Sequence, residues 1–230
     1  MNKWLESIQE WFYPSSCLLC GAPGTGRLDL CAACRGDLPH NRWACRRCGI
    51  PLPPGADGIC GACLKKPPKM DATLALFRYE EPVRLLIHDL KFRNQYAVAR
   101  LLGELLASSA AERETLPEVL IPVPLHPRRF RERGFNQSTE IARIVSRRLG
   151  IPLDYRSCSR ILPTLPQTSL PAEQRRRNMR NAFGVDGRLM YGRAAIVDDI
   201  VTTGATVNEL ARTLRKAGAG HIEVWAIARA

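Results

Sequence analysis

The segment Ala194–Leu210, with the sequence AAIVDDIVTTGATVNEL, constrains the fold more than any other part of the chain. It opens with a short apolar run, Ala194–Val197, which is the pattern of a buried parallel strand. Two acids, Asp198 and Asp199, break that run, and a loop of small and hydroxyl-bearing residues follows them. Helical spacing of apolar residues begins at about Val207. The segment therefore predicts a strand, an acidic pair, a loop and a helix, in that order.

This order has a chemical use. A helix start presents unpaired backbone N–H groups and the positive end of the helix dipole, so it can hold a phosphate. Gly204 lets the backbone approach the anion, and neighbouring hydroxyls can donate to its oxygens. Asp198 and Asp199 can accept hydrogen bonds from a vicinal diol, and a phosphate beside a diol describes a ribose 5-phosphate. The alternative is an ordinary strand-to-helix turn with a solvated acidic pair. The expected phosphate-binding residues of this loop are Val201, Thr202, Thr203, Gly204, Ala205 and Thr206.

Eight of the nine cysteines form four Cys-x-x-Cys pairs, which indicates metal ligation rather than disulfides. Two pairs complete a tetrahedral Zn²⁺ site with no open position, so we expect two structural zinc ions. Cys20-Gly21 and Cys48-Gly49 are typical of zinc knuckles. Sequential and interleaved pairing both remain open, and redox disulfides are the alternative. The expected zinc ligands are Cys17, Cys20, Cys31, Cys34, Cys45, Cys48, Cys60 and Cys63.

The flanks of the cysteine region indicate how the chain is divided. Residues 1–16 carry apolar side chains at helical spacing, which predicts an amphipathic helix. This helix either contacts a partner or a membrane surface, or packs on its own protein. The Lys/Pro-rich segment Lys65–Lys69 reads as a boundary. We therefore expect a double zinc ribbon over 17–69 and a larger domain over 70–230. No transmembrane segment or secretory leader is evident, so we expect a cytoplasmic protein, with association at the inner face of the membrane as an option.

The net charge of +12 is unevenly distributed. From Pro122 to Phe183 there are 13 arginines and 4 acids, a local balance of +9. Such a stripe suits the phosphates of a nucleotide, of pyrophosphate or of nucleic acid, and a solvated charged face is the alternative. Its densest groups are Arg128–Arg133, in an expected loop before a helix from about Gln137 to Leu149, and Arg175–Arg177, in an expected long loop over 162–181.

Apolar patterns predict the remaining elements. Cys158 falls in one of the expected strands and should be a buried apolar side chain rather than a nucleophile. Two helices are expected before the basic stripe, over Pro82–Lys91, with Lys91 outside its apolar face, and over Tyr96–Ala110. Further strands are expected over Thr73–Tyr79, Val119–Val123, Tyr155–Ile161, Ala182–Val185 and His221–Ile227.

The run from the apolar strand through the acids to Thr-Thr-Gly-Ala-Thr resembles the ribose-phosphate signature of type I phosphoribosyltransferases. Nearly the whole chain resembles the ComF family of competence-associated proteins, also described as ComFC or GntX-like. The resemblance implies an α/β fold of the type I phosphoribosyltransferase kind, with a parallel sheet flanked by helices and a small N-terminal zinc-ribbon domain. Besides the cysteine pairs, the segments that carry it are LIHDLKF (Leu86–Phe92), IPVPLHPRRFRERGFNQ (Ile121–Gln137), LPQTSLPAEQRRRNMRNAF (Leu165–Phe183) and IVDDIVTTGATVNEL (Ile196–Leu210).

The same resemblance implies roles for individual residues. Asp198 and Asp199 would bind the ribose hydroxyls of phosphoribosyl pyrophosphate (PRPP), which binds with Mg²⁺, and the threonine loop would surround its 5-phosphate. The stretch after Val123, which includes Arg128 and Arg133, stands where these enzymes hold pyrophosphate. Here Pro122–Leu125 replaces the usual glycine-containing loop, and no base-recognition hood is apparent. Two further arginines, Arg175 and Arg176, lie in the position of the flexible catalytic loop.

Members of this family support uptake of single-stranded DNA in competent bacteria and cooperate with a helicase-like partner. We therefore expect a PRPP-binding, phosphoribosyltransferase-like protein that supports DNA uptake in natural competence. Whether it is an enzyme, a phosphoribosyltransferase with an unidentified acceptor, stays open. The alternative is a non-catalytic module that binds single-stranded nucleic acid or a partner through its zinc ribbons and arginine stripe. A purely structural protein with a vestigial site is disfavoured by the intact acid pair and threonine loop.

Overall fold

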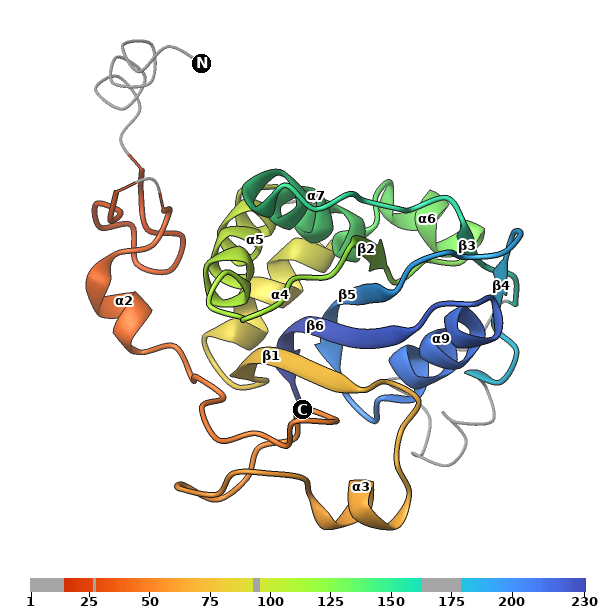
Figure 1. Cartoon of the computed structure of the whole chain (residues 1–230). Helices are drawn as coiled ribbons and strands as arrows, with labels where there is room; N and C mark the ends of the chain where they lie inside the picture. The colour runs from red at the N-terminus through yellow and green to blue at the C-terminus, as the bar shows by residue number, and fades with distance from the viewer. Residues whose placement is uncertain (1–14, 27, 93–95, 163–178) are drawn as a thin grey trace.

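The computed structural model describes residues 15–26, 28–92, 96–162 and 179–230 (Figure 1). The centre of the molecule is a four-stranded sheet in the order β1-β6-β5-β2, and its neighbouring strands pair in parallel. All carboxyl ends of these strands therefore meet at one edge of the sheet. A smaller antiparallel sheet pairs β3 with β4. The strands are β1 Ala72–Arg78, β2 Val119–Pro122, β3 Cys158–Arg160, β4 Phe183–Val185, β5 Arg193–Val201 and β6 His221–Arg229.

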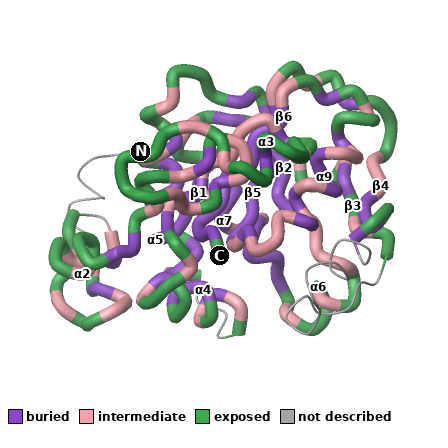
Figure 2. The backbone as a smooth tube through the Cα atoms, turned by 90° about the horizontal axis from the view of Figure 1, so that it is seen from below, coloured by how far each residue is buried: buried purple, intermediate pink, exposed green. Residues whose placement is uncertain are grey.

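Helices cover both faces of the parallel sheet (Figure 1). Side chains such as Val197 and Trp225 pack under α4 (Val83–Phe92), α5 (Tyr96–Ala110) and α7 (Gln137–Leu149). Alternate side chains, such as Ile196 and Val224, pack under α9 (Ala205–Lys216) on the other face. Both faces of the strands are thus buried, which explains the uninterrupted apolar runs in the sequence. Figure 2 shows buried backbone concentrated along these strands and exposed backbone over the small helix α3 (Gly61–Lys65).

The helices α5 and α7 have the bounds that the sequence predicts. The side chain of Asn136 caps the start of α7, where its oxygen accepts a hydrogen bond from the Ser138 backbone N–H, and Gly150 in the left-handed region ends the helix. The remaining predicted strands and α4 are found within a few residues of their expected positions. The amphipathic helix expected over residues 1–16 falls almost wholly outside the described residues.

Two expectations about local structure are wrong. The acids do not end the central strand, because β5 continues to Val201 and its backbone stays in register with β6 (Asp198 beside Ala226). The segment Pro127–Arg133 is a helix, α6, and not a loop. Proline at its first position, and Gly134 with a φ of 78° after its last, give it a favourable start and end although it buries none of its residues.

The cysteine region forms two similar units, which contain the short helices α2 (Ala32–Gly36) and α3. In the first unit the Cys17 N–H donates to the Ala22 carbonyl, and in the second the Cys45 N–H donates to the Ile50 carbonyl. The two cysteine-rich units therefore also repeat each other in backbone structure. Across the four described ranges, we find no helix that combines the length and the apolar composition needed to cross a bilayer.

Candidate functional site

The eight paired cysteines form two clusters, and the cysteines group in chain order. The sulfur atoms of each cluster lie within 4.8 Å of one another, so the interleaved pairing is not the one adopted. Sulfurs that share a tetrahedral zinc with bonds of about 2.3 Å lie roughly 3.8 Å apart. The sulfur–sulfur distances of 3.7 Å for Cys20–Cys31 and for Cys48–Cys60 match this spacing. The thiolate set and its spacing fit two structural zinc ions. The clusters are Cys17, Cys20, Cys31 and Cys34, and Cys45, Cys48, Cys60 and Cys63.

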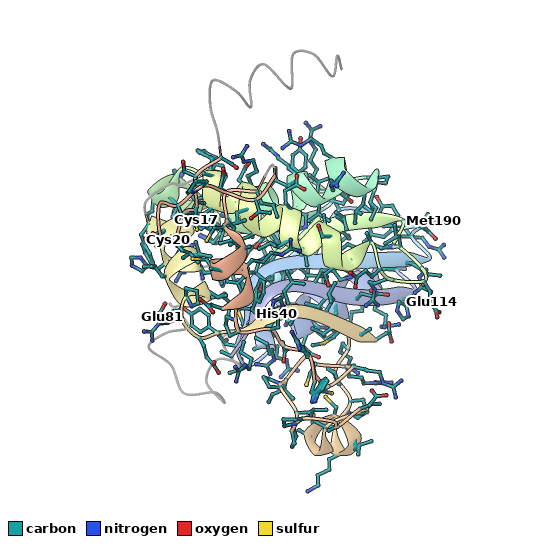
Figure 3. The ribbon with its side chains drawn as sticks, turned by 90° about the vertical axis from the view of Figure 1, so that its left-hand side faces the viewer. Cys17, Cys20, His40, Glu81, Glu114 and Met190 are labelled. Atoms are coloured by element: carbon teal, nitrogen blue, oxygen red, sulfur yellow. The ribbon has the colours of Figure 1, made fainter. Side chains whose placement is uncertain are left out.

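One thiol in each cluster is poised to ionise. Burial raises the pKa of Cys17 and Cys45, but backbone N–H groups that donate to their sulfurs outweigh it and lower the pKa to about 6 and about 7, respectively. The Cys60 N–H, for example, lies 3.3 Å from the Cys45 sulfur. Such donors stabilise thiolates, the form that binds a metal. Figure 3 shows Cys17 and Cys20 side by side in the first cluster.

The ninth cysteine, Cys158, is buried in β3, as expected. Burial, together with the negative charges of Asp154 and Asp186, raises its pKa to about 12. It is therefore a protonated apolar side chain and a poor nucleophile.

The second zinc unit packs directly on the edge of the parallel sheet. Thr73 of β1 donates through its backbone N–H to the Arg46 carbonyl at 2.9 Å and through its hydroxyl to the Arg47 carbonyl at 2.6 Å. Gly49 has a φ of 68°, and a Cβ at this position would lie 2.7 Å from the Thr73 methyl carbon. Glycine is thus required both by the turn and by the close approach of the knuckle to β1.

The acids Asp198 and Asp199 lie buried near the carboxyl end of β5. The Ser138 hydroxyl and the Asp199 backbone N–H donate to one oxygen of Asp198, at 3.1 and 3.0 Å. Asp199 accepts the Ile200 N–H at 2.9 Å, and its other oxygen lies 2.7 Å from the Lys91 ammonium of α4. The pair is therefore held by α4, α7 and its own strand.

The two carboxyls have opposite shifts in pKa. Burial, followed by the charge of Asp199, raises the pKa of Asp198 well above its ordinary value. Burial also acts to raise the pKa of Asp199, but the charge and hydrogen bond of Lys91 outweigh it and hold that pKa below its ordinary value. The pair thus favours one neutral and one ionised carboxyl. This division lets one group donate and the other accept hydrogen bonds.

The loop between β5 and α9 contains the residues expected to bind phosphate. Gly204 has a φ of 73° and forms the N-cap of α9, a conformation that favours glycine. The Thr203 hydroxyl accepts the Ala205 N–H at 3.3 Å, which orders the start of the helix. The side chain of Arg229 stabilises the loop, because it donates to the Val201 carbonyl at 3.1 Å and to the Thr202 carbonyl. Thr206 lies in the first turn of α9. This is a helix start that can take an anion.

Arginines approach the acids from α6 and β3. Arg133 donates to the Gln137 side chain at 3.2 Å, and its guanidinium carbon lies 5.6 Å from the centre of the Phe92 ring. Burial and the charge of Arg129 lower the pKa of Arg133, whereas the charge of Asp199 opposes this shift. The structure therefore brings Arg133 toward the acids. Arg128 is exposed on the same helix, whereas Arg175 and Arg176 lie outside the described residues.

Four residues of this site were not singled out from the sequence: Lys91, Ser138, Arg160 and Arg229. Arg160 of β3 is half-hidden, and burial, followed by the charge of Arg129, lowers its pKa to about 10, while the charge of Asp198 opposes the shift. Lys91 and Ser138 lie in or beside the LIHDLKF and RGFNQ segments, so those motifs held a usable signal. Arg229 donates to backbone carbonyls, and a sequence does not indicate which carbonyls an arginine will contact.

Comparisons with known proteins agree with this arrangement. A double zinc ribbon domain model matches residues 8–64. The chain is 36% identical over 228 residues to competence protein F of Haemophilus influenzae, covering 95% of this chain and 99% of the relative. It is also 36% identical over 227 residues to the DNA utilization protein YhgH of Escherichia coli K12, covering 94% and 97%.

Among solved structures, the purine phosphoribosyltransferase of Pyrococcus horikoshii aligns with a TM-score of 0.33 and 21% identity, over 59% of this chain and 83% of that one. The sequence relatives are matched over almost their whole length, with both cysteine clusters and the acid-and-loop segment inside the aligned chain. This protein therefore belongs to the competence protein F and YhgH family, the ComF family.

Proposed function

We propose that this protein binds Mg²⁺–PRPP where β5 ends, with Asp198 and Asp199 on the ribose hydroxyls and Val201–Thr206 around the 5-phosphate. One observation carries the proposal: a buried acid pair with divided ionisation adjoins a glycine-capped helix start. Diol and phosphate are the two groups that this pair of features recognises. Ligands of open α/β sheets bind at the carboxyl ends of their strands, which is where both features lie.

The Lys91 ammonium balances the negative charge of Asp199, because the two groups form an ion pair. A ribose hydroxyl that donates to Asp199 competes with the Lys91 ammonium for the same carboxylate. The ammonium is then available to neutralise negative charge on the pyrophosphate, together with Arg133 and Arg160. Mg²⁺ would enter with PRPP beside Asp198 and Asp199 and would supply further positive charge to its phosphate oxygens.

Arginines near the leaving group are also what a transferase needs. When a nucleophile attacks the anomeric carbon, the bond to pyrophosphate breaks and negative charge collects on the leaving group. Arg128 and Arg133 of α6, with Arg175 and Arg176, are our candidates for stabilising that charge. Release of pyrophosphate upon addition of an acceptor would make the protein a phosphoribosyltransferase. Binding without release would make it a PRPP-responsive module.

The test is a calorimetric titration of Mg²⁺–PRPP into the zinc-loaded protein. The Asp198→Asn/Asp199→Asn variant should lose binding while it keeps its zinc content. A matched control is Glu112→Gln/Glu114→Gln, which also removes two acids but from the exposed turn after α5. Figure 3 shows Glu114 at the opposite end of the sheet from Glu81, which follows the carboxyl end of β1. The control should bind PRPP like the unaltered protein. Absence of binding by the zinc-loaded, unaltered protein would refute the proposal.

We place this activity in DNA uptake during natural competence, because relatives are named competence protein F and DNA utilization protein. The organisation that we propose has a double zinc ribbon over 17–69 and a phosphoribosyltransferase-like domain over 70–230, after the N-terminal residues 1–16. We propose that it acts in the cytoplasm with a helicase-like protein as the partner, and association with the inner face of the membrane stays an option.

A second function has its own support in α6. This helix exposes Arg128 and Arg131, and its Phe130 is 49% exposed. Cations beside an exposed aromatic ring suit the backbone and bases of single-stranded DNA. Fluorescence anisotropy with a labelled oligonucleotide tests this function, because Arg128→Gln/Arg131→Gln should weaken binding and flatten its dependence on salt. Equal binding by the variant and the unaltered protein at every salt concentration would exclude α6 as the DNA contact.

A further inference from the structure

Arg229, the last residue of β6, connects the phosphate loop to the second zinc cluster. Its guanidinium donates to the carbonyls of Val201 and Thr202, on the loop, through Nη1. Its Nε donates to the carbonyl of Cys48, a cysteine of that cluster, at 3.0 Å. Only 7% of Arg229 is exposed to solvent. Figure 1 shows the C-terminus, just after β6, close to the orange chain of the second zinc unit.

The guanidinium suits this task because its donors form a fixed planar fork. If one of the carbonyls that accept from Arg229 moves, the guanidinium must move with it. The other carbonyls must then follow, or a hydrogen bond breaks. The Arg229 side chain is itself buried, so water does not replace these hydrogen bonds at low cost. The position of the Cys48 carbonyl is thereby coupled to the conformation of the loop at Val201 and Thr202.

Zinc bound by the second cluster would fix the position of the Cys48 carbonyl. Cys45 and Cys48 form the knuckle of the second cluster, and the Gly49 N–H donates to the Cys45 carbonyl at 2.8 Å to close its turn. Thr73 ties the same turn to β1. A small cysteine-rich unit of this kind depends on its metal for a defined structure. A zinc ion with four thiolates also carries two net negative charges, which favour the cationic guanidinium beside it.

The first cluster makes a different kind of contact. Its unit joins the helical layer, where Asp29 pairs with Arg100 of α5 and Leu30 packs in the core with that helix. These contacts lie away from the loop of Val201–Thr206. The two clusters therefore offer an internal comparison, since both fit zinc but the Arg229 side chain donates a hydrogen bond to the second.

We propose that Arg229 is a positioning residue for the phosphate loop and that zinc in the second cluster sets its position. Phosphate-ligand affinity then depends on zinc in the second cluster and not in the first. The part of this inference that concerns affinity rests on the proposed binding of PRPP. The part that concerns loop order does not.

The first experiment needs no ligand. Hydrogen exchange of the backbone amides over 202–206 is compared between the zinc-loaded protein and its Arg229→Gln variant. The variant should retain both zinc ions and exchange these amides about tenfold faster, because the lost charged hydrogen bonds each stabilise the loop modestly. The matched control is Arg78→Gln. Arg78 is an exposed arginine of β1 that lies beside Arg229 in the sheet, so its loss should leave the exchange of these amides unchanged. Unchanged exchange in Arg229→Gln would overturn the inference, whatever PRPP does.

The second experiment measures coupling to the metal. By linkage, zinc in the second cluster must tighten PRPP binding by the same factor as PRPP tightens zinc binding there. We expect PRPP to raise the zinc association constant of the second cluster about tenfold in the unaltered protein and in Cys20→Ser, which disrupts the first cluster. Competition with a zinc chelator measures this constant with and without PRPP. Neither Arg229→Gln nor Cys48→Ser should show this factor. PRPP binding without coupling would overturn the inference and leave the proposed function intact, whereas absence of PRPP binding with altered loop exchange would do the reverse.

Discussion

The ion pair between Lys91 and Asp199 should be a strong internal contact of the site. Its charged atoms lie 2.7 Å apart, with 23% of the Lys91 side chain and 12% of the Asp199 side chain exposed. At an effective dielectric constant of about 20, unit charges about 4 Å apart attract by roughly 4 kcal/mol, and desolvation offsets part of this. We expect Lys91→Met to destabilise the protein by about 2–3 kcal/mol, because it leaves the buried Asp199 without its cation.

A double-mutant cycle isolates this pair. The free energy of unfolding is measured by urea denaturation, with saturating zinc, for Lys91→Met, Asp199→Asn and the double variant. The coupling energy should be about 2 kcal/mol. An exposed control pair, Arg78–Glu80, has its atoms 3.2 Å apart with side chains 46% and 54% exposed, and should couple by at most ~0.5 kcal/mol. Equal coupling in the two pairs would refute the reasoning from burial.

The pH dependence of this coupling has a defined sign. Lys91 holds the pKa of Asp199 below its ordinary value of 3.8, so the pair contributes stability above that value. That contribution is lost as the pH falls through the lowered pKa of the folded protein. The coupling should therefore stay constant from about pH 5 to 8 and disappear only in stronger acid.

Other variants test the remaining features of the site. At a pH below the ordinary pKa of 3.8, Asp198→Asn should be as stable as the unaltered protein. At pH 8 the variant should be more stable by about 1–2 kcal/mol, because the raised pKa of Asp198 makes its ionisation in the folded protein costly. Urea denaturation at both pH values measures this difference. Gly204→Ala should cost about 1–2 kcal/mol through its φ of 73° alone, since the nearest atoms to an added Cβ are 3.9 Å away; a loss below the error of the denaturation curves would contradict the backbone argument. Cys158 should resist alkylation by iodoacetamide at pH 8 in the folded protein, since its pKa is about 12, and mass spectrometry of its peptide reads the modification.

Long periodic helices were the most predictable parts of the chain. The bounds of α5 and α7 follow from sustained apolar spacing and, for α7, from Asn136 and Gly150 at its ends. The helix α6 escaped prediction because it buries none of its residues and so has no apolar period. The extension of β5 through its acids also escaped, because the pairing with β6 and not side-chain polarity decides where this strand ends.

The site itself was predictable only where one segment holds the chemistry. Asp198, Asp199 and the threonine loop are contiguous, and the cysteines carry a characteristic spacing. Lys91 was assigned to the outside of its helix, which is correct for the apolar face of α4 but ignores the distant acid that approaches it. Contacts between segments far apart in the sequence, such as this one, depend on the arrangement of the sheet.

The order of strands in the sheet has a consequence for how the protein is made. Among the strands that the structure describes, β1 pairs in the parallel sheet with β6, and Ala72 lies beside Glu223. During synthesis β1 leaves the ribosome long before β6 is made, so the edge of β1 that pairs with β6 stays unpaired until then. The segment between the zinc units forms a bridge from His40 to Phe77 of β1, which covers the opposite edge of that strand. Nascent chains stalled before β6 should consequently be prone to aggregation and depend on chaperones until the last strand enters the middle of the sheet.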